Sequence, residues 1–186
     1  MKWSKLKLLL LAMMSGALLG GVTTGCAPVA TYPSIGERPF SFTQPNFEPL
    51  PTLMAEAIRF THIRFGGGRE FAINLPPDTY PVIYDTVIKK LGEGTPMTSA
   101  DQWAYHIISV RSRGFTAEVD IIYPRESGPH ELMTIHLRRK VLSYSVEHTR
   151  LWRIHVDVPP PHYVPPSDSA QDGAAEAPDT MDTTVD

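Results

Sequence analysis

The chain of 186 residues has a single cysteine, Cys26. One cysteine excludes an intramolecular disulfide, so the folded part must be held together by packing. A nucleophilic thiol needs a partner base and a sheltered pocket. Cys26 instead stands between an apolar segment and a proline-rich one. We therefore expect this residue to be a point of attachment and not a nucleophile.

The sequence also lacks an excess of basic residues. It has 17 lysines and arginines against 20 aspartates and glutamates, a formal net charge of −3. Three of the lysines lie within residues 1–25, and residues 165–186 contain six acidic residues and no basic one. The central part is neutral. Because nucleic-acid binding normally needs a net basic face, we predict no nucleic-acid partner.

No apolar run has the length of a permanent membrane helix, which needs about 20 apolar residues. The apolar segment "LLLLAMMSGALLGGV" covers residues 8–22, which is 15 residues. It follows a positively charged start, "MKWSKLK", and precedes small residues. This arrangement is typical of a secretory signal peptide. We predict that residues 1–25 are such a peptide.

The residues that end this segment, "VTTGC", resemble the lipobox of bacterial lipoproteins. Thr24 and Gly25 supply the small residues at the two positions before the cysteine. Thr23 stands where this family usually has leucine. The resemblance covers residues 1–26 alone.

The lipobox resemblance implies that Cys26 carries a diacylglycerol thioether, that the leader is cut before it and that the new amino terminus is acylated. Ala27, which follows the cysteine, is not aspartate; in this family that implies the outer membrane. Two or three acyl chains hold a protein firmly on a membrane. The resemblance thus predicts a lipid-anchored protein of the bacterial cell envelope that faces the periplasm, with the membrane as its partner through Cys26.

Most of the 18 prolines lie on either side of a central segment. Residues 28–51 contain six of them, and residues 159–178 contain six more. We predict a proline-rich tether over residues 26–50, extended at about 3.1 Å per residue. The folded domain is then residues 51–158, and residues 159–186 form a proline-rich, then acidic, disordered tail.

Hydrophobic periodicity predicts the order helix, strand, helix and four strands within the domain. The expected helices are 51–65 and 80–91, and the expected strands are 70–75, 103–112, 115–123, 130–138 and 141–158. This order predicts an α+β domain with a four- to five-stranded, mainly antiparallel sheet and two helices on one face. The order of elements loosely resembles the cystatin-like and nuclear-transport-factor-like (NTF2-like) folds.

Local signals add detail to this prediction. Asp78 or Thr79 is expected to cap the second helix, and Gly92 lies just past its end. A two-residue turn at Arg113–Gly114 would join the first long hairpin. The last strand places Tyr144, Val146 and Trp152 on one side, and its length suggests a bend or break near His148.

The outward face of the predicted sheet gathers the candidate site residues Ser109, Glu118, Asp120, His136 and Arg138. In the expected register Ser109 neighbours Glu118, His136 faces Glu118 or Asp120, and Arg138 faces Thr116 or Glu118. The set allows a hydrolytic triad or cross-strand charge pairs on a solvated face. A triad also needs oxyanion donors, and the backbone N–H groups in mid-strand are already paired within the sheet. The sequence also has no G-x-S-x-G turn. Cross-strand charge pairs are therefore favoured over a triad.

The seven histidines form no H-x-H or H-E-x-x-H motif, and we predict neither a metal nor a cofactor. His106 is expected to be a hydrogen-bonded core residue. The basic turn in "LRRK", residues 138–140, has two interpretations. It discourages pairing of strand edges, or it contacts an acidic partner or lipid headgroups.

The sequence therefore favours a lipid-anchored envelope protein whose domain is not an enzyme and binds an envelope protein or a small ligand, or acts in assembly. The alternative is a hydrolase or ligand-processing enzyme with a pocket between helices and sheet. In that case His136 would transfer protons together with Glu118 or Asp120.

Overall fold

The computed structural model describes residues 29–34, 48–141 and 143–166. The predictions for the leader, for Cys26 and for the acidic part of the tail lie outside these residues. Neither helix in the described ranges has the length and apolar character needed to cross a membrane.

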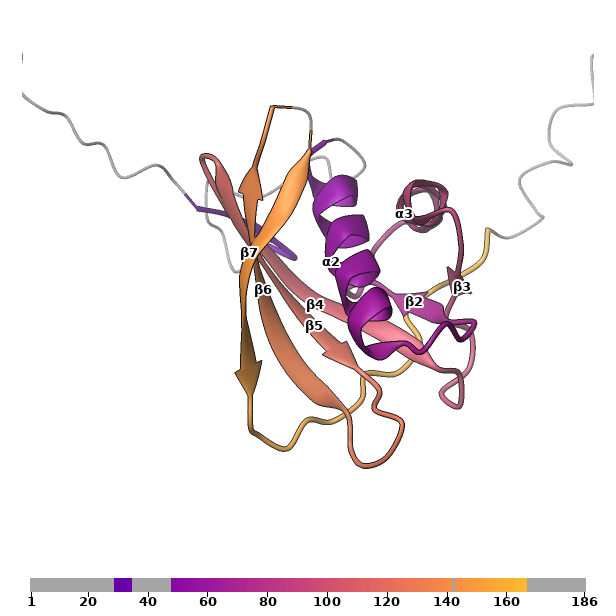
Figure 1. The fold of residues 1–186 in the computed structure, drawn as a ribbon. Coiled ribbons are helices and arrows are strands. Elements are labelled where there is room, and N and C mark those ends of the chain that lie inside the picture. The colour runs from indigo at the N-terminus through magenta and orange to yellow at the C-terminus, as the bar shows by residue number, and fades with distance from the viewer. Residues whose placement is uncertain (1–28, 35–47, 142, 167–186) are drawn as a thin grey trace, which may run out of the picture.

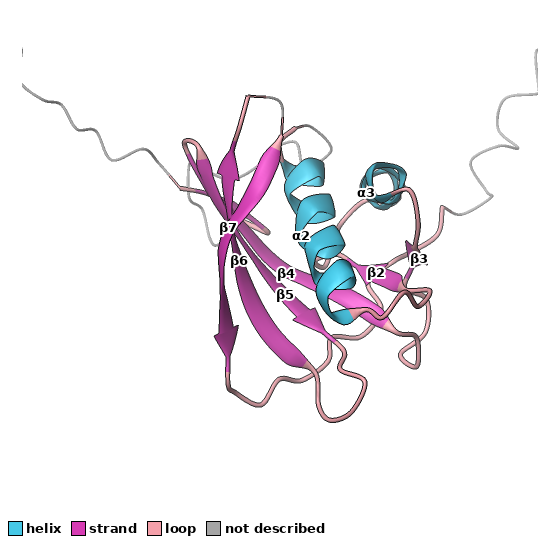
Figure 2. Cartoon of the chain, in the orientation of Figure 1, coloured by secondary structure: helices cyan, strands magenta, loops and turns pink. Residues whose placement is uncertain are grey.

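Seven strands form one mixed sheet, and two helices lie on its concave side (Figures 1 and 2). The helices are α2 (Leu50–Phe65) and α3 (Pro81–Leu91). The strands are β1 (Ala30–Tyr32), β2 (Ala72–Asn74), β3 (Thr95–Pro96), β4 (Ala104–Arg113), β5 (Thr116–Tyr123), β6 (Glu131–Arg139) and β7 (Tyr144–Trp152).

The strand order is β3-β2-β4-β5-β6-β7, and β1 pairs with β4 on the same edge as β2. The predicted α+β class is confirmed, but the sheet is larger than predicted and partly parallel. Strand β2 is parallel to both β3 and β4. All three residues of β2 are buried, so its pattern carries no alternation that would reveal its neighbours.

Helix α2 confirms the predicted helix of residues 51–65 to within one residue. Pro51 lies in its first turn, where the missing N–H costs nothing. Leu53, Met54 and Ile58 are fully buried against the sheet. Helix α3 packs beside α2, and its Tyr84 hydroxyl accepts a hydrogen bond from the N–H of Leu75 at 3.1 Å.

For the second helix, the predicted N-cap is wrong and the predicted end at Gly92 is confirmed. Tyr80 occupies the N-cap position with no side-chain hydrogen bond. The Thr79 hydroxyl instead donates to the carbonyl of Pro76 at 2.7 Å. Gly92 ends the helix with φ 83°, and its N–H donates to the carbonyl of Ile88.

The four long strands are antiparallel, as predicted, with one error of register. The first hairpin turns at Gly114–Phe115, so Arg113 pairs with Thr116 and Ser109 with Asp120, not with Glu118. From Ser109 to Arg113 the shift is two residues, which leaves these side chains on their predicted faces. A bulge at Ile108 interrupts the alternation before this stretch, and there Ile107 is buried while Ile108 is exposed. Gly114 has φ 59°, a conformation that suits the turn to this residue.

A bulge in β7 changes which residues of this strand face the core. His136 pairs with His148 and Leu137 with Val146, so Glu147 is an extra residue. Tyr144 and Val146 pack against the core. Beyond the bulge Trp152 lies on the outer face, and the prediction that it shares a face with Tyr144 is wrong.

Both proline-rich segments contribute to the folded part. Residues 30–32, predicted as tether, form β1, and Tyr32 is buried. The predicted disordered tail begins with residues that dock on the domain. Asn74 donates from its amide nitrogen to the carbonyl of Pro160 at 2.8 Å and accepts from the N–H of His162 at 3.0 Å.

Candidate functional site

The outer face of the sheet carries a connected polar network across β4, β5 and β6. Strand pairing places Ser109 opposite Asp120, Arg111 opposite Glu118, and Asp120 opposite Thr134. It also places Glu118 opposite His136, which is one of the two predicted arrangements. These three strands thus bring four of the five predicted residues together.

Asp120 is the centre of this outer-face network. Arg111 donates to both of its carboxylate oxygens, with Nη2 3.1 Å from Oδ1. Thr134 donates to Oδ1 at 2.6 Å and Ser109 to Oδ2 at 2.8 Å. Burial alone raises the pKa of Asp120, but these hydrogen bonds outweigh it and the net pKa lies below its usual value. The carboxylate is charged and its acceptor sites are occupied.

The geometry does not assemble a Ser-His-Asp triad. Ser109 donates its proton to Asp120 and accepts from Nη1 of Arg111 at 2.8 Å. His136 lies one strand further on, with Nδ1 3.5 Å from Oε1 of Glu118. Its ring stacks on His148 with 3.9 Å between centroids. Ser109 is bonded to a carboxylate of lowered pKa, which is a much weaker base than the imidazole that activates the serine of a triad.

Arg138 lies apart from this network. It pairs with Thr116 across the strands, the first of its two predicted arrangements, and its guanidinium contacts Glu147 at 2.8 Å. Among the described residues, no three histidine, cysteine, aspartate or glutamate side chains are arranged to hold a metal ion.

Sequence reasoning missed three members of the outer face: Arg111, Thr134 and Trp152. Arg111 follows Ser109 by two residues, so the alternation of β4 would have placed both on one face. Thr134 accepts a hydrogen bond from the indole nitrogen of Trp152 at 2.9 Å. That contact depends on the bulge at Glu147; a bend or break near His148 was predicted, but not the change of face that the bulge causes.

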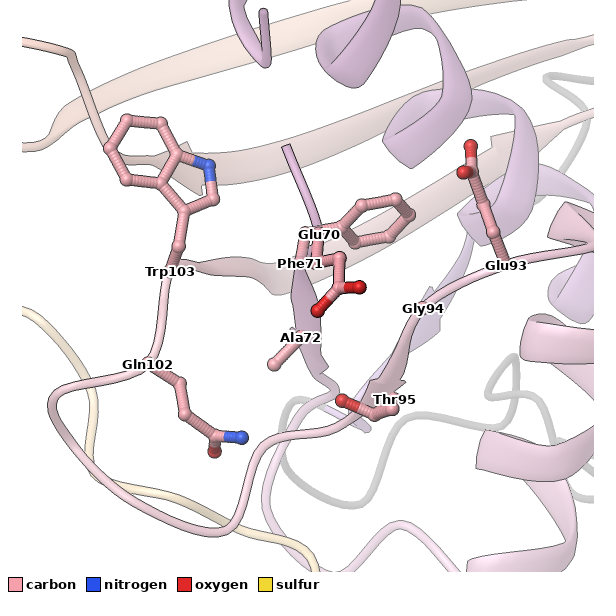
Figure 3. Close-up of a pocket in the computed structure, with 8 residues that line it drawn as sticks. All are labelled: Glu70, Phe71, Ala72, Glu93, Gly94, Thr95, Gln102 and Trp103. Atoms are coloured by element: carbon pink, nitrogen blue, oxygen red, sulfur yellow. The ribbon is translucent and has the colours of Figure 1, made fainter. Parts of the chain in front are cut away.

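A second site, which the sequence did not indicate, is a pocket of about 540 Å³ (Figure 3). It lies where the parallel strands β2, β3 and β4 begin. Three short segments line it. They are residues 70–72 at the start of β2 (Glu70, Phe71 and Ala72), residues 93–95 at the start of β3 (Glu93, Gly94 and Thr95), and residues 102–103 just before β4 (Gln102 and Trp103). These segments are far apart in the chain, and only the parallel pairing brings them together.

The pocket combines negative charge with aromatic walls. Glu70 and Glu93 are its charged lining residues, and Phe71 and Trp103 supply rings. The Arg69 guanidinium lies 4.8 Å from the centroid of the Trp103 ring, so a cation already packs on this indole. No lining residue is basic, and the pocket therefore favours a positively charged ligand.

Behind the pocket, a histidine and a tyrosine are held in fixed positions. Nδ1 of His62 is 3.1 Å from the hydroxyl of Tyr105, and its Nε2 is 3.9 Å from Oε1 of Glu93. Burial raises the pKa of the Tyr105 phenol. A Cβ on Gly66 would lie 2.6 Å from the Tyr105 hydroxyl, so this position accepts only glycine without rearrangement.

Comparisons with protein families, with curated proteins and with solved structures find no match to this chain. The chain is therefore characterised by its α+β fold and by two sites, the outer-face network and the pocket of Figure 3.

Proposed function

We propose that this protein is a lipid-anchored protein of the bacterial cell envelope whose domain binds a small cationic ligand and is not an enzyme. The observation that carries the binding function is the pocket with two carboxylates, two aromatic rings and no basic lining residue. Carboxylates attract an ammonium or guanidinium group, and the apolar part of the lining suits an alkyl chain attached to it. The lipobox resemblance at Cys26 supports the anchor.

Binding is favoured over hydrolysis by the arrangement of the outer-face network. Asp120 is occupied by three donor residues, and Ser109 donates to it. Neither His136 nor Asp120 lines the pocket of Figure 3. A catalytic set would need a sheltered site with a free base. The antiparallel strands curve around α2. For this reason we include the loose resemblance to cystatin-like and NTF2-like folds in this proposal.

Metabolic labelling tests the anchor. Cells that express the wild-type chain are grown with a radioactive fatty acid, and the label should appear in the protein. The Cys26→Ala variant should carry none. Label in this variant, or an unmodified cysteine at the amino terminus of the wild type, would contradict the anchor.

Titration of tryptophan fluorescence tests the pocket. Alkyl monoamines and diamines are compared with the alcohols of the same length, which match their size without the charge. We expect amines to bind more tightly, and the double substitution Glu70→Gln and Glu93→Gln to weaken them about tenfold, from the loss of two partly screened charge contacts. Glu147→Gln, on the outer face, is the matched control. Equal affinity for amines and alcohols would contradict a cationic ligand.

A further inference from the structure

Two hairpin turns lie next to each other at one end of the sheet, in the upper part of Figure 1. The N–H of Arg139 donates to the carbonyl of Phe115 at 2.7 Å, which joins the end of β6 to the β4–β5 turn. The N–H of Lys140 donates to the carbonyl of Ser143 at 2.7 Å and closes the β6–β7 turn. We name this end the tip surface and define it by Arg113, Phe115, Arg139, Lys140 and Val141.

The tip surface exposes apolar side chains beside basic ones. Phe115 is 71% exposed and Val141 is 92% exposed. Arg113, Arg139 and Lys140 are also exposed, and none of them forms an ion pair with another described residue. Apolar side chains flanked by cations suit the boundary between lipid headgroups and acyl chains.

A hollow lies beside the tip surface. Its lining has little negative charge that would repel lipid phosphates. Among the described residues that line it, Glu48 is the one acidic residue, and its carboxylate is paired with Lys90. The hollow also contains Arg139 and Val141 of the tip surface. The unpaired charge there is positive, which complements an anionic lipid surface.

Strand β1 brings the chain into the domain from this same end. It is antiparallel to β4, and Ala30 pairs with Ser112, two residues before the β4–β5 turn. From Ala30 back to Cys26 there are four residue steps, which span at most about 14 Å. A lipid on Cys26 therefore holds the bilayer close to the tip surface, because only residues 26–29 of the predicted tether lie before β1.

We propose that the tip surface docks on anionic headgroups of the membrane that carries the lipid anchor. Phe115 and Val141 enter the headgroup layer, and Arg113, Arg139 and Lys140 contact the lipid phosphates. This inference rests on the proposed anchor. It also orients the domain, because the pocket of Figure 3 lies at the start of β4 and the tip surface at its end. Ten residues of strand separate them by about 30 Å, so the pocket points away from the bilayer.

Site-specific fluorescence tests this orientation. Once Cys26 is lipidated, the mature protein has no free thiol, so single substitutions Phe115→Cys, Val141→Cys and Ser127→Cys each give one labelling site. Ser127 is exposed in the β5–β6 loop, at the other end of the sheet, and is the control. Each labelled lipoprotein is reconstituted in phosphatidylethanolamine vesicles with or without phosphatidylglycerol, and the probe is an environment-sensitive dye.

We expect a blue shift at positions 115 and 141, quenching there by brominated acyl chains, and a water-like spectrum at position 127. The triple substitution Arg113→Gln, Arg139→Gln and Lys140→Gln should lower the docking equilibrium about 100-fold, while the protein stays on the vesicles. The same change at Arg64, Arg125 and Arg153, away from the tip surface, should leave docking unchanged.

The outcomes separate the two proposals. Protein that floats with the vesicles while positions 115 and 141 stay water-like would overturn docking and leave the anchor intact. Docking that is equal with and without phosphatidylglycerol would overturn the role of anionic lipid. Wild-type protein that does not float with either vesicle would overturn the anchor and the docking together.

Discussion

The guanidinium of Arg111 reaches diagonally from β4 to β5 and contacts both carboxylate oxygens of Asp120. The carboxylate side chain is only 18% exposed, and that of Arg111 is 32% exposed. Two hydroxyl groups complete the set of donors to Asp120. All of these donors belong to the sheet. The network around Asp120 therefore fixes the three neighbouring strands β4, β5 and β6 to one another. Its role is structural.

Removal of this carboxylate should be costly. Asp120→Ala leaves Ser109 and Thr134 without their carboxylate acceptor and leaves Arg111 with Glu118 as its one acidic partner. We expect it to lower the free energy of unfolding by about 2–4 kcal/mol. The control is Glu147→Ala, which breaks the exposed pair with Arg138 and should cost less than about 1 kcal/mol. Urea unfolding of both variants measures the difference. Equal losses would contradict the central role of Asp120.

His106 should make the stability depend on pH. Burial, with smaller effects from His130 and His162, lowers its pKa to about 4, while the unfolded chain has a pKa of about 6.5. A lowered histidine pKa means that the unfolded state takes up the proton first. The contribution of neutral His106 to the free energy of unfolding is therefore complete above pH 6.5 and is lost as the pH falls toward 4. The loss is about 3 kcal/mol in total.

Urea unfolding at several pH values between 7 and 4 measures this effect. The ring of His106 faces Asn74, whose amide nitrogen is 3.2 Å from Nδ1, and the ring of His130. His106→Gln keeps a hydrogen-bond acceptor near Asn74 but does not titrate. We expect the variant to have a smaller loss of stability over this range. An unchanged pH profile would show that other groups cause it.

Asn74 should control the docking of the segment that follows the sheet. Its side chain is buried and holds both Pro160 and His162. Asn74→Ala removes both contacts and should lower the free energy of unfolding by about 2–3 kcal/mol. It should also make residues 159–163 accessible to proteases. His155→Ala is the control, because His155 is exposed in the same segment, and its effect should stay within about 0.5 kcal/mol.

The parts of the fold that were predicted correctly are those with a repeated local pattern. Helix α2 has an apolar stripe, and most of β5 and β6 alternates between apolar and polar residues. Their faces follow directly from periodicity. From Ser109 to Arg113 the predicted register of the β4–β5 hairpin is off by two residues, which changes the partners but not the faces. Ser109 therefore met Asp120 instead of Glu118.

The parts that were missed depend on contacts between distant residues. Strands β1 and β3 have three and two residues, too few for a period to be seen. The bulge at Glu147 reverses the faces of β7 and brings Trp152 to Thr134. The pocket of Figure 3 needs three parallel strands to begin side by side. The length of the last strand indicated an irregularity near His148, but the reversal of faces there, the two short strands and the pocket have no local sequence signal.

Gly66 offers a test of the packing behind the pocket. Its φ is −81°, so alanine there meets no backbone strain, and any cost is steric. The new Cβ would contact Nδ1 and the carbonyl of His62 and would lie 2.6 Å from the hydroxyl of Tyr105. We expect Gly66→Ala to lower the free energy of unfolding by about 1–3 kcal/mol.

A double-mutant cycle separates this steric cost from a general effect of glycine replacement. Tyr105→Phe removes the hydroxyl that the Cβ would meet, so Gly66→Ala should cost less in that background. The remaining cost comes from the contacts with His62. Gly92→Ala is the control: its φ is 83° and the space around it is open, so its cost of about 1 kcal/mol comes from the backbone alone. That cost should not change with Tyr105→Phe. If the costs of Gly66→Ala and Tyr105→Phe simply add, the Tyr105 hydroxyl is not what excludes a side chain at position 66.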